Sequence, residues 1–141
     1  MLRTVILNYG ESAYGMFDDV KCDAPFPDDR AAPGSWFQSQ SLACCMFRYS
    51  ITEQGRLIYH RSHYEAGPDR KTASGATWPT FKLVHVEDID MDYHGDIQLY
   101  GNAKDDTWLD YVARFTHGTL ESIRPYEELS EIHKTWFYAK D

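Results

Sequence analysis

Three carboxylates spaced two residues apart are the feature of this sequence best suited to chemistry. Asp88, Asp90 and Asp92 alternate with apolar residues such as Ile89 and Met91. On an extended strand such residues project from one face, about 6.6–6.8 Å apart. The simplest interpretation is the solvent side of an amphipathic strand. Two functional interpretations stand beside it: a site for a hard cation such as Mg²⁺ or Ca²⁺, and a mimic of a phosphate backbone.

The acid-rich stretch extends beyond this triplet. Residues 87–110 hold eight acidic residues against Lys104 alone, so they carry −7 of the net charge of −8. An acidic surface attracts a basic one, and we therefore expect a protein partner with a basic surface. Direct binding of nucleic acid is not expected, because no basic patch is available to displace counterions from phosphates. The predicted partner-binding residues are Asp88, Asp90, Asp92, Asp96, Asp105 and Asp106.

An enzyme is the alternative hypothesis. Here Asp90, Asp92 and His94, with His117, would form a metal-assisted or general-base hydrolytic site. Yet His94 and His117 each precede a glycine in the sequence. Histidine tolerates strained turn positions, so a turn role explains both residues without catalysis. The first hypothesis therefore assigns no catalytic residue, no metal and no cofactor.

The cysteines lack the spacing of a metal site or a disulfide framework. Cys22, Cys44 and Cys45 are odd in number, and neighbours on a strand point to opposite faces. Free thiols in a reducing compartment are the simplest expectation. His60 and His63 are three residues apart, which places them on opposite faces of a regular strand.

Length and composition favour one folded domain. The chain has 141 residues, and 15% of them are aromatic, which favours strands. We expect residues 1–14 to be an N-terminal extension and residues 15–141 to form a single β-rich domain. Neither a membrane span nor a signal peptide is expected, and a location inside the cell is expected.

Glycine-bearing turns predict three β-hairpins, which would position these residues. The strand pairs are 46–51 with 56–60, 89–93 with 96–100, and 109–115 with 119–123. Residues 65–79 are rich in Gly, Pro and charged residues and predict a long polar loop.

A helix is predicted after Pro125, because proline suits the first turn of a helix. Leu129, Ile132 and Trp136 would then form its apolar face. Together these elements predict an α+β fold, an antiparallel meander of six to eight strands with one C-terminal helix packed on the sheet.

Several motifs resemble a family of small uncharacterised proteins encoded by phages and prophages, over about residues 15–124. In such relatives the chain often begins near the position of Met16. The family pattern usually has an acidic residue before the cysteine at position 44, where this chain has Ala43. The motifs that carry the resemblance lie at residues 15–22, 25–27, 37–44, 49–52, 55–58, 90–95 and 113–120.

The resemblance implies a biological context and no catalytic residues. It implies a small accessory protein of a mobile element in the cytoplasm of a bacterial host cell. Small acidic phage proteins often bind and block a host protein, frequently one that handles nucleic acid in host defence. The sequence therefore favours an inhibitor of the anti-defence kind, with the hydrolase as the alternative.

Overall fold

A computed structural model gives the structure of the chain and describes residues 16–103 and 105–138. Within these ranges the chain forms ten β-strands and one α-helix. The protein is therefore β-rich, as predicted, but it is not an α+β fold, and that prediction is wrong. The predicted extension, residues 1–14, lies outside the described residues.

The strands form one large sheet and one small ribbon. The large sheet has eight strands in the order β10-β9-β8-β2-β1-β3-β4-β7, and β5 pairs with β6. Every pair is antiparallel except β1 with β3, which is parallel. The strands are β1 (Asp18–Cys22), β2 (Ser35–Ser39), β3 (Arg48–Ile51), β4 (Leu57–Ala66), β5 (Arg70–Lys71), β6 (Thr77–Trp78), β7 (Phe81–Asp90), β8 (Gly95–Asn102), β9 (Trp108–Thr116) and β10 (Thr119–Pro125).

Two of the three predicted hairpins are confirmed. β3 pairs with β4, and β9 pairs with β10 across the turn formed by His117 and Gly118. The predicted hairpin at 89–100 is wrong, because β7 lies at one edge of the sheet while β8 pairs with β2 and β9. The chain turns away after β7 instead of folding back along it.

The sheet bends so that two distant turns meet. The backbone N–H of Leu120 donates to Gly55 at 2.8 Å, and that of Gly118 donates to Tyr93 at 2.8 Å. The β3–β4 turn therefore touches the β9–β10 hairpin. Side chains from both halves of the sheet share one hydrophobic core, which includes Val20, Ile51, Leu57, Ile97, Leu99, Tyr111 and Phe115.

The C-terminal helix is short and does not cover the sheet as predicted. Pro125 ends β10, a 3-10 turn follows (η2, Tyr126–Glu128), and the helix α2 spans Glu131–Tyr138. Leu129 is buried but precedes the helix, and Ile132 is 73% exposed, so these two residues do not form the predicted apolar helix face. The side chain of Trp136 lies outside the described part. Within the described ranges no helix is long and apolar enough to cross a membrane.

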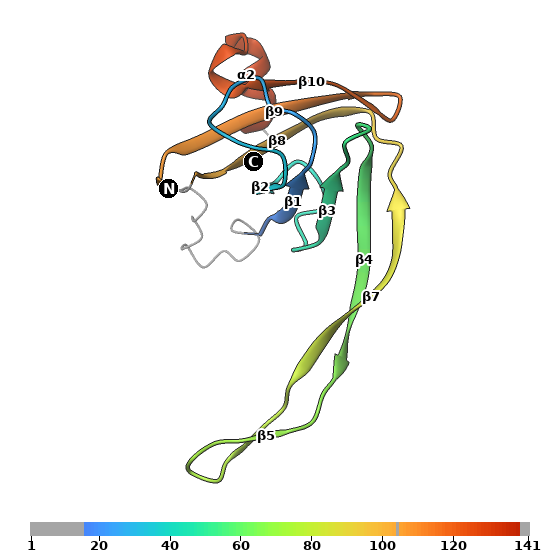
Figure 1. Cartoon of the computed structure of the whole chain (residues 1–141), viewed down its shortest axis with the longest axis vertical. Coiled ribbons are helices and arrows are strands. Elements are labelled where there is room, and N and C mark those ends of the chain that lie inside the picture. The colour runs from blue at the N-terminus through green and yellow to red at the C-terminus, as the bar shows by residue number, and fades with distance from the viewer. Residues whose placement is uncertain (1–15, 104, 139–141) are drawn as a thin grey trace.

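A long β-ribbon projects from the sheet. β4 and β7 are ten residues each and pair well beyond the end of their contact with β3, and β5 and β6 continue the ribbon to its tip (Figure 1). We call residues 61–87 the arm. The polar loop predicted for 65–79 is therefore wrong, because its charged residues lie at the end of a paired ribbon. Gly75, with φ of 88°, lies in the turn at the tip.

Candidate functional site

Asp88, Asp90 and Asp92 do not form the regular stripe that their spacing predicts. β7 ends at Asp90, and Asp92 has a left-handed backbone conformation with φ of 46°. The guanidinium of Arg56 donates to the two Asp90 oxygens at 2.8 and 3.1 Å and lies 3.5 Å from Asp92. The bond from Arg56, followed by the backbone N–H of Asp92, holds the pKa of Asp90 below its ordinary value. A cation of the chain itself therefore offsets these two carboxylates.

The other three predicted acids lie apart from this triplet. The side chain of Asp96 on β8 is only 11% exposed and bonds to His133 at 2.8 Å. Asp105 and Asp106 follow β8, so roughly 20 Å of strand separates them from Asp96. The structure therefore distributes the six acids over several places instead of one continuous surface.

The alternative hydrolytic residues meet at one corner of the sheet, where their contacts are those of a turn. His94 Nδ1 accepts a hydrogen bond from the backbone N–H of His117 at 3.0 Å, and the two rings lie 4.9 Å apart. His94 Nε2 lies 3.3 Å from the guanidinium of Arg114. His117 has φ of 49° and shares the tight turn with Gly118. With Asp90 and Asp92 bound to Arg56, this corner fits a structural role.

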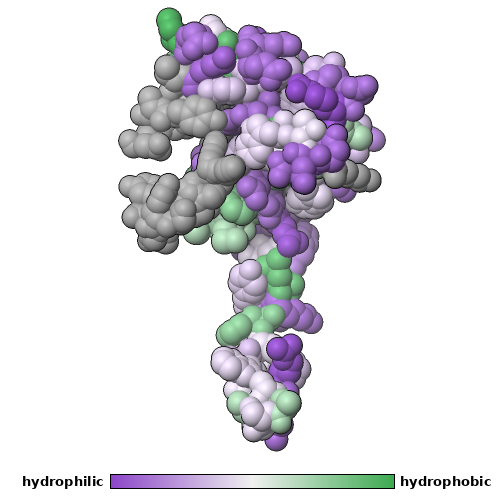
Figure 2. All heavy atoms as spheres, turned by 90° about the vertical axis from the view of Figure 1, so that its left-hand side faces the viewer, coloured by the Kyte–Doolittle hydropathy of each residue, from purple (hydrophilic) through white to green (hydrophobic). Residues whose placement is uncertain are grey.

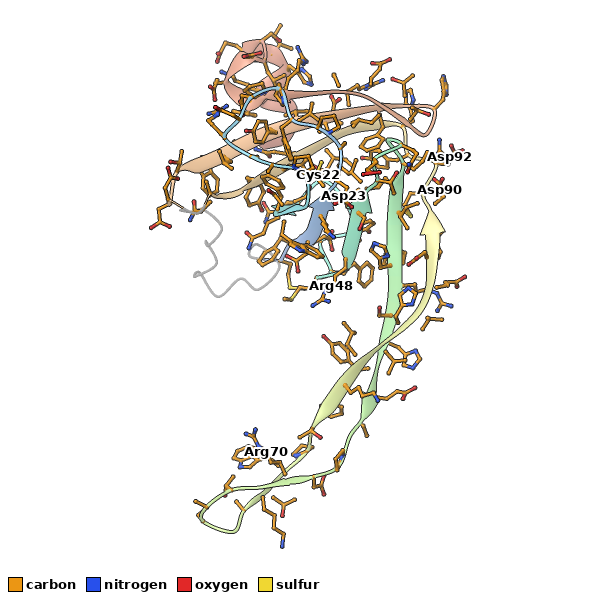
Figure 3. All side chains as sticks on the ribbon, viewed as in Figure 1. Cys22, Asp23, Arg48, Arg70, Asp90 and Asp92 are labelled. Carbon is orange, nitrogen blue, oxygen red and sulfur yellow. The ribbon has the colours of Figure 1, made fainter. Side chains whose placement is uncertain are left out.

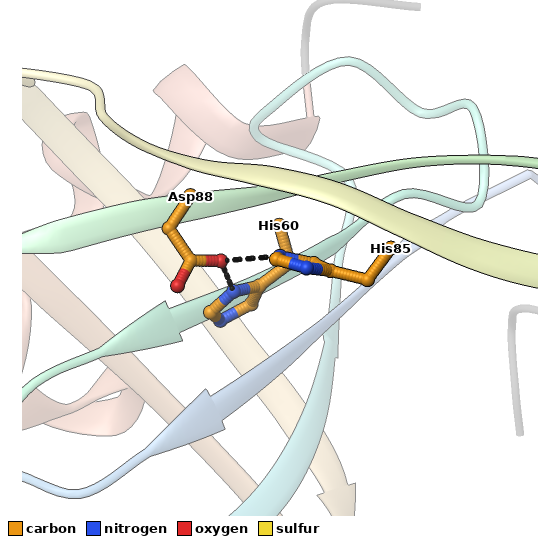
Figure 4. A group of neighbouring side chains, drawn as sticks. All are labelled: His60, His85 and Asp88. Carbon is orange, nitrogen blue, oxygen red and sulfur yellow. Dashed lines mark hydrogen bonds and ion pairs between the residues drawn. The ribbon is translucent and has the colours of Figure 1, made fainter.

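A different group of side chains converges on the outer face of the sheet. His60 on β4 is the cross-strand partner of Asp88 on β7, and its Nδ1 lies 2.7 Å from Asp88 Oδ1 (Figure 4). His85 Nε2 lies 2.7 Å from the same oxygen. Hydrogen bonds from His60 first and His85 second hold the pKa of Asp88 below its ordinary value. Ser50 on β3 extends the group, because its Oγ lies 2.6 Å from His60 Nε2.

A β-bulge brings His85 into this group. Ser62 pairs with His85, and Arg61 pairs with Glu87, so Val86 is the extra residue on β7. In a regular strand residues three apart point to opposite faces. The bulge turns His85 onto the face that carries Asp88. Sequence analysis missed the group because neither the bulge nor the β4–β7 register is visible in a run of residues.

Two kinds of chemistry use such residues, and the surroundings fit one of them better. The chain of hydrogen bonds from Ser50 through His60 to Asp88 has the order of an acyl-transfer triad. Such a reaction also needs N–H donors aimed at the developing oxyanion. β3 lies between β1 and β4, and Ser50 is paired on both sides, so the sheet already uses the nearby backbone donors. Two imidazoles and a carboxylate open to solvent instead suit metal binding.

The arm carries a second candidate surface. Tyr64 pairs with Leu83, and Ala66 pairs with Phe81, so these residues share one face of the ribbon. Tyr64 is 72% exposed and Phe81 is 66% exposed. Figure 2 shows hydrophobic side chains along the arm. We call Tyr64, Phe81 and Leu83 the apolar strip.

The apolar strip lies on the opposite side of the sheet from the core. In the body Leu57 and Tyr59 point to the core, and His60 points outward. Most residues in phase with the core along the arm are polar, including His63 and Glu65, although Val84, the partner of His63, lies on the same face. The apolar and polar faces are therefore exchanged where the ribbon leaves the body. The exchange leaves apolar side chains open to solvent, and exposed apolar patches are typical of interaction surfaces.

Comparisons of the chain with protein-family models, with curated proteins and with solved structures found no match.

Proposed function

We propose that the protein acts by binding another protein, and that the apolar strip of the arm is the principal contact surface. The observation that carries this proposal is the exposure of Tyr64, Phe81 and Leu83 on one face of a ribbon that projects from the body. The resemblance to phage and prophage proteins supports a host protein as the target. In this proposal the protein works stoichiometrically, as an inhibitor or adaptor in a bacterial cell.

The low stability of an isolated two-stranded ribbon is a second reason to expect a partner that covers the arm. An isolated β-hairpin has marginal stability in water, because it cannot bury a face. Covering an apolar side chain contributes about 1.5–3 kcal/mol when burial is complete. The apolar strip would therefore contribute several kcal/mol to an interface, which is a substantial part of the free energy of a micromolar complex, about 8 kcal/mol.

Charge separates the arm from the rest of the chain. The arm has four basic residues (Arg61, Arg70, Lys71 and Lys82) against three acidic ones, a net charge of +1, so the remainder of the chain carries −9. Figure 3 places Arg70 near the far end of the arm, while Asp90 and Asp92 lie at the opposite end of β7. The surface that receives the arm should therefore be apolar with acidic residues at its rim.

The acidic body supports the earlier hypothesis of a basic partner as a second candidate. The net charge of −9 outside the arm favours this second hypothesis, and substitution of Asp105 and Asp106 tests it. The two hypotheses predict opposite charge on the partner. For a host protein as partner, Arg70→Glu with Lys71→Glu should slow association if the arm docks first, whereas Asp105→Asn with Asp106→Asn should slow it if the body docks first.

A second copy of this chain is one specific receptor for the arm. The body has a hollow of about 750 Å³ lined by apolar residues that include Trp36, Phe37 and Leu109, with Asp29 and Asp105 beside them. Trp36 is 54% exposed. Arg30 also lines this hollow and offsets one of the two acidic residues, so the apolar side chains are the feature that matches the arm, and such a contact would join copies head to tail.

The test compares a strip variant with a variant of the opposite arm face. Phe81→Ser with Leu83→Ser removes apolar area from the strip, while His63→Ser with Val84→Ser changes two residues on the other face of the ribbon. Binding to a captured host protein, or self-association by light scattering, should fall roughly 100-fold for the first variant, about 3 kcal/mol, and change little for the second. Equal effects of the two variants, with circular dichroism unchanged, would contradict the proposal.

A further inference from the structure

We propose that His60, His85 and Asp88 form a binding site for a divalent transition-metal ion, with Zn²⁺ as the best fit. One candidate ligand atom from each residue lies within 4.8 Å of the other two. The site lies where the arm leaves the body, and it does not depend on what the arm binds.

The donor set suits this class of ion. Imidazole nitrogen favours zinc and neighbouring transition metals, whereas Mg²⁺ and Ca²⁺ prefer sites made of oxygen. Zinc bonds to histidine and carboxylate ligands are about 2.0–2.2 Å, which places tetrahedral ligands roughly 3.4 Å apart. His60 Nδ1 and His85 Nε2 each lie 2.7 Å from Asp88 Oδ1, so a small outward movement of exposed side chains would admit the ion. Three protein ligands leave a fourth position for water or for a group of a partner.

The protons of the site rearrange without any further reactant. A carboxylate only accepts hydrogen bonds, so both imidazole nitrogens that face Asp88 carry a proton when no ion is bound. His60 Nε2 then accepts from the Ser50 hydroxyl. When the ion binds, the proton of each neutral ring moves to its other nitrogen, and His60 Nε2–H donates to Ser50 Oγ instead. Ser50 is therefore a positioning residue that fits either tautomer.

The bulge at Val86 is a separate observation in favour of the site. A bulge interrupts the ladder of hydrogen bonds; bulges are common in edge strands, such as β7, and beside functional sites, where they re-aim a side chain. Here the re-aimed side chain is His85, which a regular β7 would place on the opposite face from Asp88. A bound ion would join β4 to β7 at the root of the arm and hold the two strands together.

The experiment measures Zn²⁺ binding to the whole chain by isothermal titration calorimetry. The protein is prepared without a polyhistidine tag, treated with a chelator and kept reduced. We expect one ion per chain and at least a tenfold loss of affinity for His85→Gln and for Asp88→Asn. Co²⁺ should give the absorption spectrum of a nitrogen- and oxygen-bound tetrahedral ion, and excess Mg²⁺ should not compete.

The matched control is His63→Gln. His63 is an exposed histidine on the other face of the same ribbon, where it bonds to Glu65 at 2.8 Å, and its replacement should leave Zn²⁺ affinity unchanged. Cys44→Ser with Cys45→Ser should also leave it unchanged, which separates this site from binding by thiols. His85 and Asp88 have side chains that are 56% and 55% exposed, so both variants should keep the fold by circular dichroism.

Three results would overturn the metal site. They are absence of binding up to about 1 mM Zn²⁺, equal loss of affinity in His63→Gln and His85→Gln, and tight binding that survives both His85→Gln and Asp88→Asn. None of these results bears on docking through the apolar strip, which the arm variants test separately.

Discussion

Tyr64 and Leu83 are direct cross-strand partners in the arm, and both side chains are open to solvent, at 72% and 41% exposure. Such a pair stabilises a sheet best when a further layer covers it. Among the described residues, no element covers the face of the arm that carries this pair. The pair therefore marks the surface where we expect a partner to bind.

Removal of the bond between Arg56 and Asp90 should lower stability at neutral pH and have little effect in acid. The folded-state pKa of Asp90 lies below its ordinary value, so this carboxylate contributes stability above the unfolded pKa of about 3.9 and loses it as pH falls through the folded pKa. Asp90→Asn should therefore lower the urea midpoint at pH 7, and the difference from the native chain should shrink near pH 3. A difference that is independent of pH would show that the charge of Asp90 is not the cause.

Gly118→Ala should destabilise the fold more than Gly75→Ala. Both glycines have nearly the same left-handed conformation, with φ of 87° and 88°, so the strain of adding a side chain is similar, about 1 kcal/mol. A Cβ on Gly118 would also displace the ends of the Asp92 and Arg56 side chains and disturb their ion pair, whereas Gly75 faces open space. Urea unfolding of the two variants measures the difference. In an Arg56→Ala background the excess for Gly118 should become smaller, and equal losses in the native background would refute the contact.

Asp18→Asn should destabilise the protein by about 2 kcal/mol or more. The Asp18 side chain is fully buried and accepts backbone hydrogen bonds from Cys44, Cys45 and Phe47 at 2.7, 3.1 and 2.9 Å. An amide has one oxygen in place of two and would direct an N–H₂ group at donors. Asp29→Asn on the exposed surface is the control and should have little effect on the urea midpoint. If both variants have the same midpoint as the native chain, Asp18 does not anchor the segment that contains the two cysteines.

Cys22 should resist thiol reagents until the protein unfolds. It is fully buried, and burial raises the pKa of its thiol to about 11, so little thiolate forms at pH 8. Cys45 is exposed and should react rapidly. A colorimetric thiol assay on the native chain and on Cys45→Ser would show whether the fast phase belongs to Cys45. Rapid labelling of Cys22 in the native chain would mean that the core opens readily.

Local sequence signals predicted the turns better than the order of the strands. Gly55 and Gly118 have positive φ and close the two confirmed hairpins, because glycine is suited to such turns. The third predicted hairpin was wrong because the chain leaves the ribbon at Asp92, a turn that alternation alone does not reveal. The insertion of β1 and β2 between β3 and β8 depends on long-range packing.

The candidate sites could be predicted only in part from the sequence, because they also depend on long-range pairing of strands. Asp88 was predicted as a binding residue, but its partners His60 and His85 become neighbours only through the β4–β7 register and the bulge at Val86. The arm was predicted as a loop because its composition includes Gly67, Pro68 and Gly75, which are typical of loops. Alternation around Tyr64 and Leu83 was the signal that could have revealed it.

Photocrosslinking from the arm tests whether the apolar strip binds a partner protein. A photoreactive phenylalanine derivative at position 64 lies within the apolar strip, and the same group at position 63 lies on the opposite face. We predict one discrete adduct from position 64, of twice the chain mass if the partner is a second copy, and little from position 63. With a host protein as the partner, excess unlabelled native chain should abolish this adduct, whereas excess Phe81→Ser, Leu83→Ser chain should not. Equal adducts from both positions, or equal competition by the two chains for a host protein, would contradict docking through the apolar strip.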